Sequence, residues 1–122
     1  MTPSRSIQAG ALLAAIAVAL GAFAAHGLKN HLDAHALDIF NTAARYQMIH
    51  AIALILTGIV ARQQGSKHAP LASLLFVVGI LLFCGSLYLL ALTGVGWLGA
   101  ITPFGGIAFI AGWLHFMYFS AR

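Results

Sequence analysis

The stretch Phe40 to His50, FNTAARYQMIH, carries the chain from a polar connection into a long apolar segment that ends at Arg62. It places four polar or ionisable side chains at the start of that segment: Arg45, Tyr46, Gln47 and His50. Such side chains are costly within a membrane unless they face protein, water or one another. The segment therefore predicts a membrane-spanning helix, and these four side chains are where a function would be sought.

The two sides of this segment differ in chemistry. On a helix with about 100° per residue, one face is small and polar. Its members, including those at its margins, are Thr42, Ala43, Tyr46, Gln47, His50, Ala53, Thr57 and Ala61. The other side holds Ile49, Ile52, Ile55, Leu56, Ile59 and Arg45, whose long side chain can reach lipid head groups. We predict that the small, polar face points into a helix bundle and that the isoleucine face contacts lipid.

The composition excludes an ordinary soluble domain. Of the 122 residues, 61% are hydrophobic and 7% are charged, whereas about a quarter of a soluble domain is charged. The formal charge of +4 comes from basic residues scattered at the ends of apolar segments. That position is typical of topology signals, so we predict contact with a lipid bilayer and no nucleic-acid binding.

Three further apolar runs accompany the first. The four predicted spans are about 7–25, 43–61, 71–92 and 104–119, which form one all-α domain over residues 1–122. Short connections predict an antiparallel bundle of four transmembrane helices. The connection Gly27 to Asn41 has the pattern of a short amphipathic helix between spans 1 and 2.

The first run also resembles a signal peptide, because it follows a basic start and contains A-F-A at Ala22 to Ala24. Its small residues, however, share one face: Gly10, Ala14, Ala17, Gly21 and Ala24. Large residues form the opposite face: Leu13, Ile16, Leu20 and Phe23. A packing stripe of this kind serves a bundle helix, so we predict a retained span.

The other spans carry similar seams of small residues. In the third span the seam is Ala72, Gly79, Ser86 and Thr93, and in the fourth it is Gly105, Ala108, Gly112 and His115. Trp113, Tyr118 and Phe119 fit an aromatic belt at the membrane surface. These seams predict close approach of helix backbones.

Metal and thiol chemistry have little support in the sequence. His31 and His35 have the i, i+4 spacing of a shared metal, with Asp38 following, but no third ligand is evident and a solvated loop is favoured. The lone Cys84 lies in an apolar run and is interpreted as a small hydrophobe. We predict no metal site.

Basic residues set the expected orientation. Arg5, Arg62, Lys67 and Arg122 fall on one side, while Lys29 and Arg45 fall on the other with both aspartates. The positive-inside rule then places both termini in the cytoplasm and residues 27–41 outside.

Four motifs in order resemble one family: GAFAAHGL at 21–28, FNTAARYQMIHA at 40–51, GSLYLL at 85–90 and ITPFGG at 101–106. They are similar to domain-of-unknown-function family 423, small bacterial inner-membrane proteins related to transmembrane protein 256. The resemblance implies a plasma-membrane location and a retained first span. It implies no activity, substrate or cofactor.

We expect a non-enzymatic accessory, assembly or structural subunit of the inner membrane, present as a homo-oligomer or within a larger membrane complex. The alternative is a haem-, metal-, quinone- or lipid-binding protein whose site, near the outer membrane face, uses His26, Tyr46, Gln47 and His50. A small-solute transporter acting as an oligomer is a third hypothesis. Catalysis is not expected, because neither aspartate lies in a span and no serine has evident histidine and acid partners.

Overall fold

The computed structural model describes residues 1–65 and 69–121, and the described chain is almost entirely helical. Its elements are α1 (Pro3–His26), the 3₁₀ helix η1 (Leu28–Asn30), α2 (Ala34–Gln64), α3 (Ala69–Gly79), the π-helical turn η2 (Ile80–Cys84), α4 (Gly85–Thr93), the 3₁₀ helix η3 (Gly96–Ala100) and α5 (Thr102–Ser120). Because α3, η2 and α4 follow one another without a break, they form one third span. Within residues 1–65 and 69–121, four helical segments are long and apolar enough to cross a membrane, which confirms the predicted fold class.

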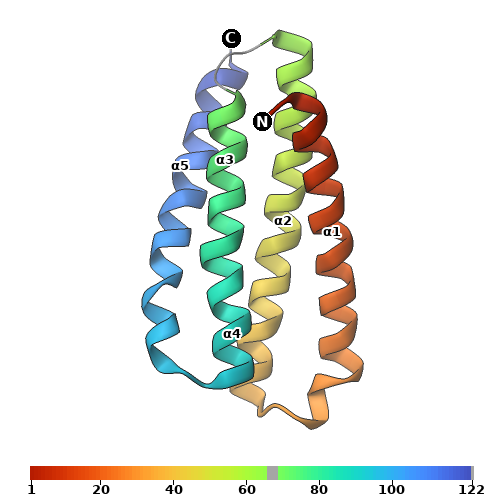
Figure 1. Cartoon of the computed structure of the whole chain (residues 1–122), viewed down its shortest axis with the longest axis vertical. Helices are drawn as coiled ribbons and strands as arrows, with labels where there is room; N and C mark the ends of the chain where they lie inside the picture. The colour runs from red at the N-terminus through yellow and green to blue at the C-terminus, as the bar shows by residue number, and fades with distance from the viewer. Residues whose placement is uncertain (66–68, 122) are drawn as a thin grey trace.

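The four spans form a flattened bundle with α2 and the third span at its centre (Figure 1). The outer helix α1 packs along α2, and the outer helix α5 packs along the third span. Both termini lie at one end of the bundle, and η1 and η3 lie at the other (Figure 1). Consequently α2 and α5 run in the same direction.

Local capping explains where the helices begin and end. Thr2 and Asp33 are N-caps whose side-chain oxygens accept from the backbone N–H of Arg5 at 3.2 Å and of Ala36 at 2.7 Å. Gly65 and Gly94 end α2 and α4 in the left-handed region, with φ of 62° and 70°, which glycine adopts without steric cost. The sequence predicted a short amphipathic helix between spans 1 and 2. Because α2 already begins after its N-cap Asp33, this connection consists of η1 and the first turns of α2.

Small residues lie where the helices meet, as the seams predicted. A Cβ added to Gly10 would lie 2.5 Å from the carbonyl oxygen of Ala51, and one added to Gly112 would lie 2.9 Å from the Phe76 ring. A Cβ on Gly105 would overlap the backbone of Phe83. The α1–α2 and α3–α5 pairs therefore approach as closely as glycine allows.

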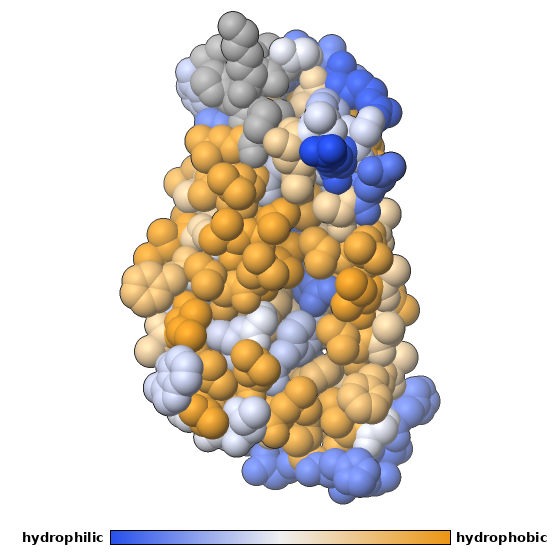
Figure 2. All heavy atoms as spheres, viewed as in Figure 1, coloured by the Kyte–Doolittle hydropathy of each residue, from blue (hydrophilic) through white to orange (hydrophobic). Residues whose placement is uncertain are grey.

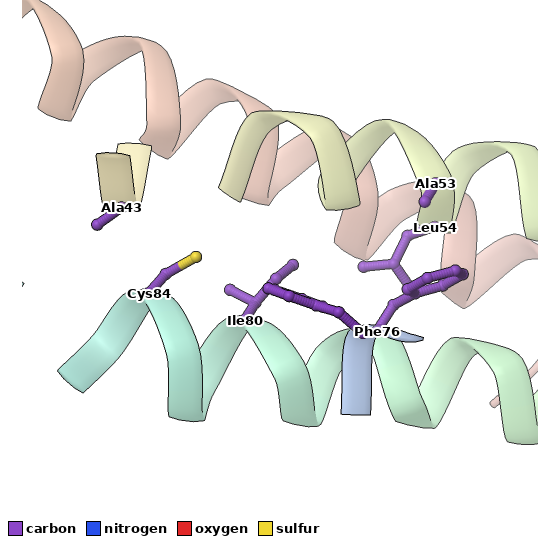
Figure 3. Packing of buried hydrophobic residues seen from close by; sticks show 7 residues of the cluster. Ala43, Ala53, Leu54, Phe76, Ile80 and Cys84 are labelled. Carbon is purple, nitrogen blue, oxygen red and sulfur yellow. The ribbon is translucent and has the colours of Figure 1, made fainter. Parts of the chain in front are cut away.

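The core between α2 and the third span is apolar. Figure 3 shows Phe76, Ile80 and Cys84 pointing from the third span toward α2, where Ala43, Ala53 and Leu54 lie. Cys84 is thus a buried part of this packing.

The face of the bundle shown in Figure 2 is mostly apolar through the middle and polar toward its two ends. On α2, the side predicted to meet lipid is exposed at Arg45, Ile49, Ile52, Leu56 and Ile59, while Ile55 is half-buried against α1. The opposite side is buried at Ala43, Gln47, His50, Ala53, Thr57 and Ala61. The predicted division of α2 into a buried face and an exposed face is therefore confirmed at these positions.

Other positions differ from the sequence prediction, and Tyr46 of the predicted inward face is exposed. Leu13 and Leu20 are half-buried, because the third span lies beside the flank of α1 that carries them. Thr93 is exposed at the end of α4, where its hydroxyl donates to the Leu89 carbonyl at 2.6 Å. The π turn η2 interrupts the regular periodicity that the seam in this span assumes.

Candidate functional site

Gln47 and His50 lie near the middle of the 31-residue α2 and form the centre of a buried polar layer. Their partners on the outer helices, Leu13 in α1 and Trp113 in α5, also lie near mid-helix. The layer is therefore deeper than the site near the outer membrane face that the sequence suggested. Polar groups at this depth require protein partners, because lipid supplies none.

The Gln47 carboxamide joins three helices. Its Nε2 donates to the backbone carbonyl of Leu13 in α1 at 2.8 Å, and its Oε1 accepts from the hydroxyl of Tyr88 in α4 at 2.7 Å. Both ends of the amide are thus used, and the side chain is 3% exposed. Gln47 therefore links α1, α2 and α4 through hydrogen bonds.

The His50 ring joins α2 to α5 in one defined tautomer. Trp113 Nε1 lies 3.0 Å from His50 Nε2, and an indole N–H can only donate, so Nε2 is the acceptor. The remaining ring nitrogen, Nδ1, lies 2.7 Å from the backbone carbonyl of Tyr46 and must carry the proton that it donates there. A neutral imidazole has one donor and one acceptor, and both are used in this arrangement.

Aromatic rings surround the imidazole. The Phe109 ring of α5 stacks on His50 with centroids 3.5 Å apart and planes within 9°. The ring centroid of Phe76 in α3 lies 5.9 Å from that of His50 and 5.1 Å from that of Trp113. These rings fix the orientation of His50 and exclude other hydrogen-bond partners from it.

Two hydroxyl pairs join helices at other levels of the bundle. Ser6 and Ser73 link α1 to α3 at 2.6 Å, and Ser86 and Thr102 link α4 to α5 at 2.6 Å. Among the described residues, no buried side-chain nitrogen or oxygen lacks a hydrogen-bond partner. The polar groups of the described interior are therefore matched to one another.

The four predicted site residues occupy different places. Gln47 faces α1 and α4, and His50 faces α5, as described above. Tyr46 is 38% exposed and stacks on Phe83 with ring centroids 4.7 Å apart. His26 is exposed at the end of α1, thirteen residues beyond Leu13 and so ~20 Å along the helix from the polar layer. The structure does not bring His26 together with the other three.

The histidines of the polar connection do not share a helix face. His31 lies before the N-cap Asp33, which has extended backbone angles, and His35 lies in the first turn of α2. Among residues 1–65 and 69–121, no group of three His, Cys, Asp or Glu side chains is placed to hold a metal.

Tyr88 and Trp113 are parts of the layer that the sequence did not identify. The sequence pattern placed Trp113 in an aromatic belt and assigned no site role to Tyr88. One signal was available for Trp113, since it lies in the middle of the fourth span rather than at an end. No spacing pattern pointed to Tyr88.

Among the described residues, two grooves that open on the sides of the bundle lie near the polar layer. The larger, about 560 Å³, runs between α2 and α5. Its lining residues are Arg45, Tyr46, Ile49, His50, Phe83, Gly106, Phe109, Ile110 and Trp113. The smaller, about 270 Å³, lies between α1 and the third span and is lined by residues that include Gln47, Gly85 and Tyr88.

Comparisons with known proteins identify the family. A family model described as "Protein of unknown function (DUF423)" matches residues 20–106. The chain belongs to the DUF423 family. The resemblance inferred from the four motifs is therefore confirmed.

DUF423 relatives match over most of their length. The UPF0382 membrane protein SSP2132 of Staphylococcus saprophyticus is 49% identical over 105 residues, which is 86% of this chain and 87% of the relative. The UPF0382 membrane protein YwdK of Bacillus subtilis is 43% identical over 86% of each chain. A UPF0382 membrane protein of Haemophilus influenzae is 45% identical over 86% of this chain and 84% of the relative. No solved structure matches the chain.

The DUF423 match covers α2 and the third span completely but only part of each outer helix. Gln47, His50 and Tyr88 fall inside it, whereas their partners Leu13 and Trp113 fall outside. The relatives are named membrane proteins, and the chain has four membrane-capable helices, so this DUF423 protein is a multi-pass membrane protein.

Proposed function

We propose that this DUF423 protein is a non-enzymatic accessory or assembly subunit of the bacterial inner membrane, which works in association with a second copy or a larger membrane complex. The observation that supports the proposal is that the Gln47 and His50 side chains link neighbouring helices through hydrogen bonds. The His50 imidazole, which could perform acid–base chemistry, has one ring nitrogen bonded to Trp113 of α5 and the other to the Tyr46 carbonyl of its own helix. Both ends of the Gln47 amide are bonded by neighbouring helices.

A catalytic or ligating histidine needs a free ring nitrogen in at least one state. For His50, binding a haem iron or a metal through Nε2 would require the loss of the Trp113 hydrogen bond. A structural role keeps this hydrogen bond. This difference favours the subunit hypothesis over a haem or metal site.

The two outer helices offer different surfaces to a partner. The exposed residues of α5 are large and include Phe104, Ile107, Ile110, Leu114 and Met117, which suits lipid. One exposed flank of α1 instead carries a row of small residues, Ala11, Ala15, Ala19 and Ala22, which Val18 borders. We call this flank the alanine face. Small residues let helices approach closely in a membrane, so association through the alanine face of α1 is part of the proposal.

The proposed orientation has both termini in the cytoplasm. Arg5 and Arg62 lie at the end of the bundle that carries the termini, and Arg62 Nη2 donates to Ser4 Oγ there at 2.8 Å. Lys29 lies at the opposite end with Asp33. Lys67 and Arg122, which also enter the charge count, lie outside the described residues.

The test is the mass of the protein purified in a mild detergent, with analysis of any protein that accompanies it. We expect a dimer, a higher oligomer or a defined complex. Ala15→Phe should reduce the mass to that of a monomer, whereas Ile16→Phe, on the large-residue flank of α1, should leave it unchanged. A discrete monomer without accompanying protein would contradict the proposal.

A further inference from the structure

The groove between α2 and α5 has different chemistry at its two ends. Because the two helices run in the same direction, Arg45 and Gly106 lie toward the end of the bundle that carries η1 and η3. His50 is five residues further along α2, or ~8 Å deeper, and Trp113 lies at the same level. We call the two ends the mouth and the floor.

The floor accepts only apolar material. Trp113 uses its one N–H on His50, and His50 uses its two ring nitrogens on Trp113 and Tyr46, so neither ring has a free polar atom. The remaining lining near the floor is aromatic or aliphatic and includes Phe109 and Ile110. An occupant must therefore place a hydrocarbon part here, since an unpaired polar atom would be costly.

The mouth carries a positive charge that nothing in the described chain neutralises. Arg45 is exposed and has no hydrogen-bond or ion-pair partner among residues 1–65 and 69–121, and the Tyr46 hydroxyl has none there either. Asp38 lies two helical turns before Arg45, ~10 Å away along α2, and Asp33 caps the helix start. A guanidinium binds phosphate oxygens by charge-assisted hydrogen bonds, and a phenol hydroxyl can also donate a hydrogen bond to such an oxygen.

Gly106 keeps the mouth end of the groove open. Apart from the backbone of its own helix and its two neighbours in sequence, the nearest atom to a Cβ at this position would be in the Phe83 ring, 3.9 Å away. A larger side chain could therefore extend into the groove without displacing the backbone. Ile49 and Ile110, 45% and 62% exposed, line the groove where it opens to the side.

We propose that this groove binds an anionic phospholipid of the surrounding bilayer, with its phosphate on Arg45 and Tyr46 and one acyl chain along Phe109 to Trp113. The charged mouth lies toward one end of the bundle and the apolar floor toward its middle, which is the order of head group and chain in a bilayer leaflet. A volume of about 560 Å³ lies within the range of small-molecule sites. The site is independent of the subunit role proposed above.

The first test compares lipids and charge variants. The protein is purified in mild detergent, and its unfolding temperature is measured with added phosphatidylglycerol or phosphatidylcholine. We expect phosphatidylglycerol to stabilise the parent more than phosphatidylcholine, and Arg45→Gln to weaken phosphatidylglycerol binding about tenfold. Lys29→Gln removes the same charge from the same end of the bundle but outside the groove, so it should bind like the parent.

The second test fills the groove. Gly106→Leu should abolish the stabilisation by phosphatidylglycerol. Gly85→Leu is the matched control, because Gly85 lines the smaller groove and a Cβ there meets no atom within 4 Å. The unfolding temperature without lipid shows whether each variant is folded, and Arg45→Gln decides the question if Gly106→Leu is not.

Four results would overturn the proposal. Equal binding of both lipids by the parent would remove the role of charge, and parent-like binding by Arg45→Gln would remove the role of Arg45. Stabilisation by glycerol phosphate equal to that by the lipid would show that no acyl chain occupies the groove. Stabilisation by ubiquinone but not by phosphatidylglycerol would make the groove a quinone site.

Discussion

The indole of Trp113 donates to Nε2 of His50 across 3.0 Å and joins two parallel helices that otherwise make few contacts. The same imidazole is covered by the ring of Phe109, four residues earlier on α5. His50 therefore has a polar and an aromatic link to a single neighbouring helix. Its loss should loosen α5 more than any other element.

We expect His50→Ala to lower the free energy of unfolding by ~1–3 kcal/mol, because it leaves the Trp113 N–H without an acceptor in a dry environment. His31→Ala and His35→Ala, in exposed positions at the end of the bundle, should change stability by less than ~0.5 kcal/mol. Denaturation in detergent micelles measures both. A His50→Ala variant as stable as the parent would show that the residue is kept for a ligand or a contact site.

A double-mutant cycle measures the interaction between His50 and Trp113 separately from the contacts that each makes with other residues. Trp113→Phe and His50→Phe each leave one polar atom unpaired, whereas the double variant leaves none from this hydrogen bond. We expect the double variant to be less destabilised than the sum of the singles by ~0.5–3 kcal/mol. Strict additivity would mean that the hydrogen bond contributes nothing.

A second double-mutant cycle tests the hydrogen bonds by which the Gln47 amide links helices. Gln47→Leu removes the acceptor of Tyr88 and the donor to Leu13, so it should cost ~1–3 kcal/mol. Tyr88→Phe removes only the hydroxyl and should cost less, and the two changes should be coupled because they share one hydrogen bond. Thr42→Val is the control, since its hydroxyl bonds only within its own helix, to the carbonyl of Asp38. Equal losses of stability in Gln47→Leu and Thr42→Val would contradict the role of Gln47 as a link between helices.

The fold was predictable because membrane helices follow from residue type and periodicity alone. The spacing of Gly10, Ala17 and Ala24 gave the packing side of α1, and the spacing of Gly105 and Gly112 gave that of α5. These patterns lie within single helices, so they can be read from one sequence. The family resemblance rested on four motifs in order and was likewise available in advance.

The partners of the polar residues were not predictable from such patterns. The pairing of His50 with Trp113 depends on how α2 and α5 are placed along each other, across 63 residues of sequence. The acceptor on α1 is the backbone carbonyl of Leu13, which carries no side-chain signal. The π turn at Ile80–Cys84 has no marker either, because its residues are as apolar as those of the helix around it.

The glycine seams lead to a packing prediction. Gly79→Leu and Gly112→Leu should destabilise the bundle by ~1–3 kcal/mol or more, because the new side chains would overlap the rings of Phe109 and Phe76. Leu12→Ala is the control, since Leu12 is 62% exposed and loses little on truncation. Leu13→Ala should fall between them, because Leu13 is half-buried against the core. Similar unfolding temperatures for the Gly79→Leu, Gly112→Leu and Leu12→Ala variants would show that the helices do not meet at these glycines.

The proposed orientation can be tested by labelling single cysteines in a Cys84→Ala background. Asn30 in η1 and Gln63 near the end of α2 are both exposed and lie at opposite ends of the bundle. If both termini are cytoplasmic, a membrane-impermeant maleimide added to intact cells should label Asn30→Cys and should label Gln63→Cys only after the cells are opened. The physical reason is the excess of basic residues at the terminal end, which resist translocation. Labelling of Gln63→Cys in intact cells, with Asn30→Cys protected, would reverse the topology and move the mouth of the α2–α5 groove to the cytoplasmic leaflet.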